Sequence, residues 1–258
     1  MVNKPECAVV IGLGQLGRVF SAALLANGIA VIPVLRDSDM HALARIFSEP
    51  VLVLVATGEA DLHTVLENVP QPWRERLCLL QNELLPRDWQ QHGISNPTVI
   101  PVWFEKKTGS GLKPLLPTPV YGPASELLIA SMAQVGIPAR PLDSAEQLTF
   151  ELVLKNLYIL TINIAGLRVG GDFTSLWNQH REFAEAVFDE VLAIQEALTG
   201  GRFNRSALLA GMDAAIGGDP QHQCTGRSAP VRLARALEHA DALGLATPLL
   251  RDLARLLG

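Results

Sequence analysis

Six residues near the N-terminus have the types and spacing of a phosphate-binding loop: Gly12, Leu13, Gly14, Gln15, Leu16 and Gly17. They follow a short β-branched apolar run at 8–11 and precede a helical pattern at 18–27, the setting in which G-x-G-x-x-G binds a dinucleotide. The first glycine permits a tight turn, the second lets the backbone approach a pyrophosphate, and the third lets helix and strand pack closely. The loop and the helix N-terminus therefore predict a dinucleotide site.

The residue after the second apolar strand, at 29–35, selects between the two nicotinamide dinucleotides. A carboxylate there binds a ribose 2′-hydroxyl, whereas an arginine accommodates a 2′-phosphate. Arg36 holds this position and can bind a phosphate with two parallel hydrogen bonds. Asp37 follows directly and is the competing signal for NAD. We expect NADP (NADPH) as cofactor, with NAD as the second choice.

The elements that must position this loop alternate between strands and helices. Apolar runs at 51–55 and 77–81 add strands three and four, with helical segments between them, and such alternation is typical of a parallel sheet. From residue 145 onward the apolar pattern is helical throughout, over 147–167, 174–198, 206–216, 230–243 and 248–257. The sequence predicts an α/β Rossmann-type domain at 1–143 and an all-α C-terminal domain at 144–258.

Composition excludes several other classes of protein. The net charge is −5 and no basic cluster is dense enough for nucleic acid or an anionic membrane surface. No apolar stretch is expected to be long enough to span a membrane. Three distant cysteines predict no disulfide framework and fit the cytoplasm, and six histidines without ligand spacing predict no metal site.

Five segments in the same order give the chain a resemblance to a known family. They are the glycine loop, Leu35–Arg36, Leu79–Asn82, Phe150–Asn156 and Ala242–Pro248. On these the sequence resembles the ketopantoate reductase family over nearly its whole length. The resemblance implies an NADP-binding domain followed by a helical substrate and dimerisation domain, and an activity that reduces a small 2-oxo acid.

The resemblance also implies three site residues. Lys155 matches the family lysine that protonates the carbonyl oxygen as hydride arrives, and an ammonium suits a developing alkoxide. Asn82 matches an asparagine near the nicotinamide, and Asn163 one that contacts substrate. Lys155 could instead be an ordinary surface lysine, and Asn163 could satisfy core backbone groups.

The C-terminal segment departs from the family pattern. Gly226–Arg227 is kept, but Pro230 stands at the family's glutamate position and Arg232 at its aspartate position. Ile159 also replaces an asparagine between Lys155 and Asn163. Because specificity for polar substrate groups depends on such partners, we expect a substrate other than ketopantoate, with Arg227, Arg232 or His222 available to bind its carboxylate or phosphate.

Three functions remain open at this point. The first is an NADP(H)-dependent reductase of a small 2-oxo acid or related carbonyl, acting on a small-molecule substrate, with the helical domain as the candidate homodimer interface. The second is a catalytically inactive dinucleotide-binding or regulatory protein on the same fold. The third is another dehydrogenase of the same two-domain plan, acting on hydroxy acids, imines or amino-acid derivatives.

Overall fold

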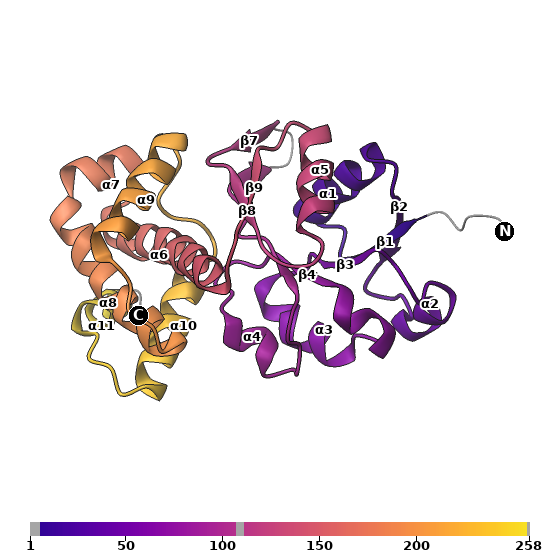
Figure 1. Cartoon of the computed structure of the whole chain (residues 1–258). Helices are drawn as coiled ribbons and strands as arrows, with labels where there is room; N and C mark the ends of the chain where they lie inside the picture. The colour runs from indigo at the N-terminus through magenta and orange to yellow at the C-terminus, as the bar shows by residue number, and fades with distance from the viewer. Residues whose placement is uncertain (1–5, 107–110, 257–258) are drawn as a thin grey trace. The chain divides into compact units, whose positions relative to one another are not determined.

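The computed structural model of the chain describes residues 6–106 and 111–256 (Figure 1). It divides into two compact units, Met1–Glu151 and Leu152–Gly258, and each is described by itself. The predicted α/β and all-α halves are confirmed as fold classes. The division between the units falls inside a helix, whereas the predicted domain boundary lies before that helix, between Asp143 and Ser144.

A five-stranded parallel sheet forms the centre of the first unit, in the order β2-β1-β3-β4-β5. Its central strands are continuous apolar runs because helices cover both faces of a parallel sheet. The strands are β1 (Cys7–Ile11), β2 (Ala30–Val34), β3 (Leu52–Val55), β4 (Leu77–Leu79) and β5 (Thr98–Val99). Strand order reverses at β1, with β2 on one side and β3 on the other, and this switch point opens a crevice at the carboxyl ends of the strands.

Helices lie on both faces of this sheet. In Figure 1, α1 and α5 pack together on one face, and α3 and α4 lie on the other. The helical segments are α1 (Gln15–Ala26), α2 (Met40–Ile46), η1 (Glu59–Asp61), α3 (Leu62–Asn68), η2 (Gln71–Arg76), α4 (Pro86–Gln90) and α5 (Ser125–Gln134). A core that includes Phe20, Leu54, Ile100 and Met132 fills the space between the sheet, α1 and α5.

Two small sheets complete this unit. They are the antiparallel pair β6 (Phe104–Lys106) and β7 (Leu112–Pro114) and the parallel pair β8 (Thr118–Val120) and β9 (Ala139–Pro141). The Thr118 hydroxyl accepts a hydrogen bond from the backbone N–H of Trp103 at 3.1 Å. This bond ties β8 to the chain that leaves β5.

The second unit is built from helices. They are α6 (Ala145–Val169), whose first turns belong to the first unit, α7 (Phe173–Gln179), α8 (Arg181–Thr199), α9 (Arg205–Gly218), α10 (Ala229–Ala242) and α11 (Pro248–Arg255). The prediction of one helix over 174–198 was wrong, because His180 leaves helical geometry and separates α7 from α8. Asp172 caps α7 by accepting from Ser175 N at 2.8 Å.

Glycines allow two close contacts with α6. A Cβ at Gly166 would lie 2.6 Å from Cys224 Cβ, and one at Gly211 would lie 2.7 Å from a methyl carbon of Leu154. Both distances are too short for real atoms. The loop that carries Cys224 and helix α9 therefore approach α6 only because these positions lack side chains.

Helix α6 is long and apolar enough to span a membrane by length and composition alone, so the expectation that no segment reaches that length was wrong. Its most apolar window is 72% buried in the structure, as for the core helix of a soluble protein. The length of α6 follows from its place at the centre of a helical unit, where it is apolar on most sides.

A chain of ion pairs joins α8 to α9. Arg205 contacts Asp189 at 2.6 Å and Glu185 at 2.9 Å, and Arg181 contacts Glu185 at 2.8 Å and Asp213 at 2.9 Å. Hydrogen bonds from Arg181 and Arg205 lower the pKa of Glu185. A lowered folded-state pKa stabilises the fold above the ordinary glutamate pKa, and this stabilisation is lost as the pH falls through the folded-state value.

We therefore expect Glu185→Gln to lower the melting temperature at neutral pH by about 2–4 °C, the equivalent of roughly 1 kcal/mol. The difference from wild type should close as the pH falls from about 5 to about 2.5, measured by thermal unfolding across pH. The matched control is Glu238→Gln on the exposed face of α10. A difference that persists in acid, or an equal one for the control, would contradict the account.

Candidate functional site

The glycine loop lies between β1 and α1, where a side chain would clash at two of its three glycines. Gly12 has φ +92°, and a Cβ there would lie 3.0 Å from the carbonyl oxygen of Ala56. A Cβ at Gly17 would lie 2.0 Å from the carbonyl oxygen of Gly12. At Gly14 nothing lies within 4 Å of that position. The backbone at Gly14 is therefore open to a ligand, whereas a side chain at Gly12 or Gly17 would meet protein atoms.

Helix α1 begins beside this open backbone. Its N-cap is Gly14, which offers no side-chain cap, and the first helical hydrogen bond runs from Arg18 N to Gly14 O. The amide groups of Leu16 and Gly17 therefore have no acceptor within the helix. Unpaired N–H groups and the helix dipole favour an anion at this end of α1.

A cavity of about 500 Å³ opens at the switch point of the sheet. The glycine loop and the carboxyl ends of β2 and β3 line this cavity. The lining residues are Ile11, Gly12, Leu13, Gly14, Val34, Leu35, Arg36, Ser38, Met40, Ala56, Thr57, Gly58, Asp61, Thr64 and Val65. Four predicted cofactor residues thus line one cavity, namely Gly12, Leu13, Gly14 and Arg36, whereas Gln15, Leu16, Gly17 and Asn82 do not.

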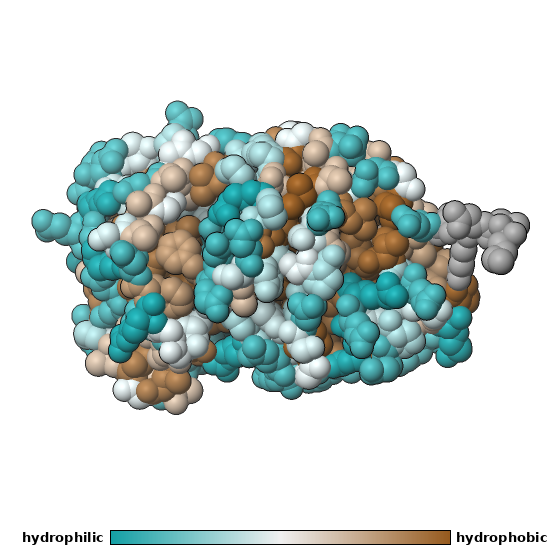
Figure 2. Space-filling view, viewed as in Figure 1, coloured by the Kyte–Doolittle hydropathy of each residue, from teal (hydrophilic) through white to brown (hydrophobic). Residues whose placement is uncertain are grey.

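Arg36 and Leu35 give this cavity a charged and an apolar part. Arg36 is exposed and forms no ion pair or side-chain hydrogen bond with any residue that the structure describes. Leu35 is 49% exposed. Figure 2 shows apolar side chains gathered on the surface over the α1 and β2 region. A free guanidinium beside apolar surface suits a ligand that joins a phosphate to a flat base.

Gln81 fixes the segment after β3, part of which lines the cavity. It is 7% exposed, and its Nε2 donates to the carbonyl oxygens of Val55, at 2.8 Å, and Thr57, at 3.3 Å. Its Oε1 accepts from Leu80 N at 3.2 Å. The side chain therefore joins the end of β4 to the segment after β3. Sequence reasoning missed this role, for which the one signal was a polar residue at the end of an apolar run.

Replacing Gln81 tests the strength of this bridge. We expect Gln81→Leu to lower the free energy of unfolding by about 1–3 kcal/mol, because the carbonyl groups of Val55 and Thr57 lose a buried donor. Urea unfolding of the whole chain measures it. The control is Gln71→Leu at an exposed position of the same unit, expected to cost less than about 0.5 kcal/mol. Equal costs for the two variants would show that the bridge contributes nothing.

Asn82 lies next to this bridge, at the carboxyl end of β4. Its Nδ2 donates to Glu59 Oε1 at 2.9 Å. The next residue, Glu83, has φ +60° and is the one non-glycine residue of the described chain with a positive φ. Such a backbone costs free energy and recurs at functional sites. The structure places Asn82 beside the predicted edge of the sheet but not in the cavity lining.

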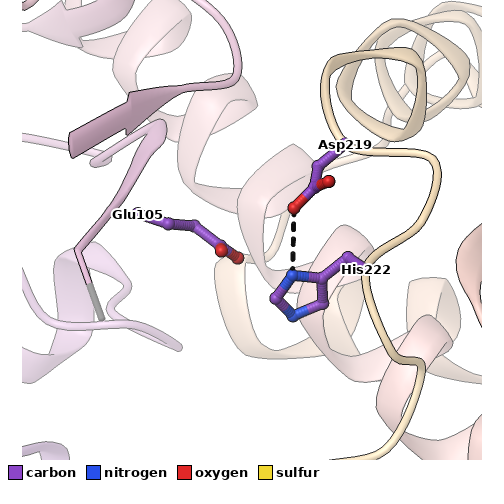
Figure 3. A group of neighbouring side chains, drawn as sticks. All are labelled: Glu105, Asp219 and His222. Atoms are coloured by element: carbon purple, nitrogen blue, oxygen red, sulfur yellow. Dashed lines mark hydrogen bonds and ion pairs between the residues drawn. The ribbon is translucent and has the colours of Figure 1, made fainter. Parts of the chain in front are cut away.

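Lys155 lies on α6 at one end of a row of rings. It is half-buried, and its Nζ lies 5.5 Å from the ring centre of Tyr158. Tyr158 packs edge-on against Phe173 at 5.7 Å, and Phe173 lies 4.9 Å from His222. His222 Nδ1 pairs with Asp219 Oδ2 at 3.2 Å, as Figure 3 shows. The ammonium of Lys155 thus makes a cation–π contact with the Tyr158 ring.

Asn163 is held from two sides within the helical unit. Its Nδ2 donates to the carbonyl oxygen of Cys224 at 3.2 Å, and Arg232 Nη1 donates to its Oδ1 at 2.6 Å. Lys155 and Asn163 are eight residues apart on α6, roughly 12 Å along the helix axis. Asn82 belongs to the other unit, so the three predicted catalytic residues are divided between the units.

Two of the cysteines are unsuited to nucleophilic chemistry. Burial raises the pKa of the Cys78 thiol to about 12. Burial, with a smaller contribution from the Asp172 carboxylate, raises the pKa of Cys224 to about 12 as well. Because the thiolate is the reactive form, neither residue is a nucleophile at neutral pH.

Two histidines that are 29 residues apart in the sequence form a hydrogen bond that their spacing did not predict. His63 Nδ1 and His92 Nε2 lie 2.9 Å apart on the exposed side of the first unit. At this distance one ring nitrogen donates a hydrogen bond to the other. The pair joins α3 to the turn after α4, and only the fold brings the two residues together.

No model of a known protein family matches the sequence, and no curated protein matches it. Solved structures do match. A 2-dehydropantoate 2-reductase from Methylococcus capsulatus has a TM-score of 0.71 at 15% identity, over 97% of this chain and 95% of that chain. The chain has the fold of the ketopantoate reductases.

Two further structures cover both chains almost fully. A dimeric ketopantoate reductase from Staphylococcus aureus has a TM-score of 0.63 at 14% identity, over 97% of this chain and 98% of that one. A D-mandelate dehydrogenase solved as a complex with NADH has a TM-score of 0.65 at 14% identity, over 96% of each chain. The resemblance inferred from the sequence is thus confirmed for the fold.

The two residues that the sequence resemblance predicts at acidic positions, Pro230 and Arg232, lie at the start of α10. Pro230 is exposed and occupies the first turn of the helix. Arg232 is half-buried and bonded to Asn163. The hydrogen bond from Arg232 to Asn163 joins the start of α10 to α6. A cation such as Arg232 favours an anionic group in a substrate.

Proposed function

We propose that the chain is an NADP(H)-dependent oxidoreductase that reduces a small 2-oxo acid or a related carbonyl compound. The observation that carries the proposal is the cavity at the sheet switch point, whose lining includes both the open backbone of Gly14 and Arg36, which has no side-chain partner among the described residues. The two features are suited to a pyrophosphate and a 2′-phosphate of one dinucleotide. Structures of oxidoreductases with the same fold agree with it.

NADP rather than NAD is favoured by the side chains at the end of β2. Arg36 belongs to the cavity lining, whereas the exposed Asp37 does not. Of these two charges at the end of β2, the cavity lining therefore includes the guanidinium alone. NAD is the alternative cofactor, because a D-mandelate dehydrogenase of similar fold was solved as a complex with NADH.

In the reaction, NADPH would supply a hydride to the carbonyl carbon. Lys155 would donate a proton to the carbonyl oxygen, and its positive charge would stabilise the alkoxide as it forms. Asn82 and Asn163 would orient the reacting groups. Arg232, fixed by Asn163, would bind the carboxylate of the substrate.

A catalytically inactive dinucleotide-binding or regulatory protein is the second candidate. It is favoured by Pro230 and Arg232, which replace the acidic residues that the family uses for its substrate. Both candidate functions include dinucleotide binding, and they differ in whether the protein catalyses a reaction. The homodimer, for which the dimeric relative gives support, and the cytoplasmic location remain predictions common to both.

Removing the charge at the end of β2 tests the cofactor proposal. We expect Arg36→Ala to weaken NADPH binding at least tenfold and to change NADH binding by less than about twofold, because the guanidinium contacts the phosphate that distinguishes them. Calorimetric titration measures both affinities, and Arg45→Ala on the exposed side of α2 is the control. Equal losses for the two dinucleotides would remove the basis for NADP.

Removing the ammonium of α6 tests the catalytic proposal. A screen of 2-oxo acids with NADPH first identifies a substrate. Lys155→Ala should then lower kcat by about 10²–10⁴-fold while NADPH affinity stays within about twofold, because only proton donation is lost. Full turnover in this variant would rule out Lys155 as the acid. A wild-type protein that binds NADPH but reduces none of the compounds would favour the second candidate.

A further inference from the structure

The turn after β2 carries a second polar group beside Arg36. Ser38 N donates to the carbonyl oxygen of Leu35 at 3.1 Å, which closes the turn. Leu35 N in turn donates to Ser38 Oγ at 2.9 Å. Ser38 is half-buried and belongs to the cavity lining. Its side chain is therefore fixed at the wall of the proposed dinucleotide site.

The hydroxyl of Ser38 has one proton to donate. Its oxygen already accepts from Leu35 N, and among the described residues no protein acceptor takes its proton. A serine hydroxyl can accept and donate at the same time. The bond to Leu35 therefore orients the oxygen and leaves the proton for a group in the cavity.

The acidic residues of this segment do not compete for that place. Asp37 lies between Arg36 and Ser38 in the chain but does not line the cavity. Asp39 caps α2 by accepting from Ala42 N at 3.0 Å. The carboxylate in the lining belongs to Asp61, which comes from the segment after β3. The turn thus presents a guanidinium and a hydroxyl donor to the cavity from positions 36 and 38.

We propose that Ser38 is a cofactor-specificity residue whose hydroxyl donates a hydrogen bond to the 2′-phosphate of NADP(H), next to Arg36. The inference rests on the proposed function. The Ser38 hydroxyl is a neutral donor beside the charged Arg36, and the backbone of the turn fixes its position. A hydrogen bond to a charged phosphate is stronger than one to a neutral group.

The test compares Ser38→Ala with Ser38→Thr, which keeps the hydroxyl. NADPH and NADH, which differ by the 2′-phosphate alone, are titrated calorimetrically into the wild type and both variants. We expect Ser38→Ala to weaken NADPH about tenfold and NADH by less than about twofold. Ser38→Thr should bind NADPH within about threefold of wild type. Thermal unfolding confirms that each variant is folded.

The NADH titration separates recognition from a structural role. If Ser38→Ala weakens NADPH and NADH equally, the residue only shapes the turn and the inference is wrong. Unchanged NADPH affinity in Ser38→Ala would overturn it too. A wild-type protein that binds neither dinucleotide would overturn the proposed function and the inference together, a result distinct from the loss of Ser38's role alone.

Discussion

The cavity in the first unit depends on the contact between the turn after β1 and the segment after β3. Gly12 has φ +92° and a Cβ there would lie only 3.0 Å from the carbonyl oxygen of Ala56, and the same glycine lies against Gly17 at the start of α1. Strand, turn and helix can therefore meet without filling the crevice that the strand order creates. The open backbone of Gly14, the N-cap of α1, then borders a cavity that the ends of β2 and β3 also line.

Buried and half-buried polar side chains join the segments at this edge of the sheet. Gln81 bonds the segment after β3 to the end of β4, and Asn82 bonds to Glu59 in the same region. The helical unit uses the same principle, since Asn163 joins α6 to the loop at Cys224 and to Arg232 on α10. Such bonds are specific because an unpaired polar group is costly when buried.

The sequence predicted the features that depend on local pattern. Apolar runs gave the four main strands, glycine spacing gave the turn into α1, and helical periodicity gave the second unit. It missed the short helices α2 and α4 and the break at His180, because short helices are stabilised more by tertiary contacts than by their own sequence. Gln81, Ser38 and Glu59 were missed for a related reason, since their roles come from partners that lie elsewhere in the fold or across a turn.

The central claim is that the loop between β1 and α1 and the turn after β2 bind one NADP(H) molecule together. A crystal structure of the chain grown with NADP⁺ tests this most directly. The account predicts the pyrophosphate against the backbone of Gly12–Gly14 and the 2′-phosphate against Arg36. Electron density for NADP⁺ elsewhere on the chain, or none at a saturating concentration of the cofactor, would contradict it.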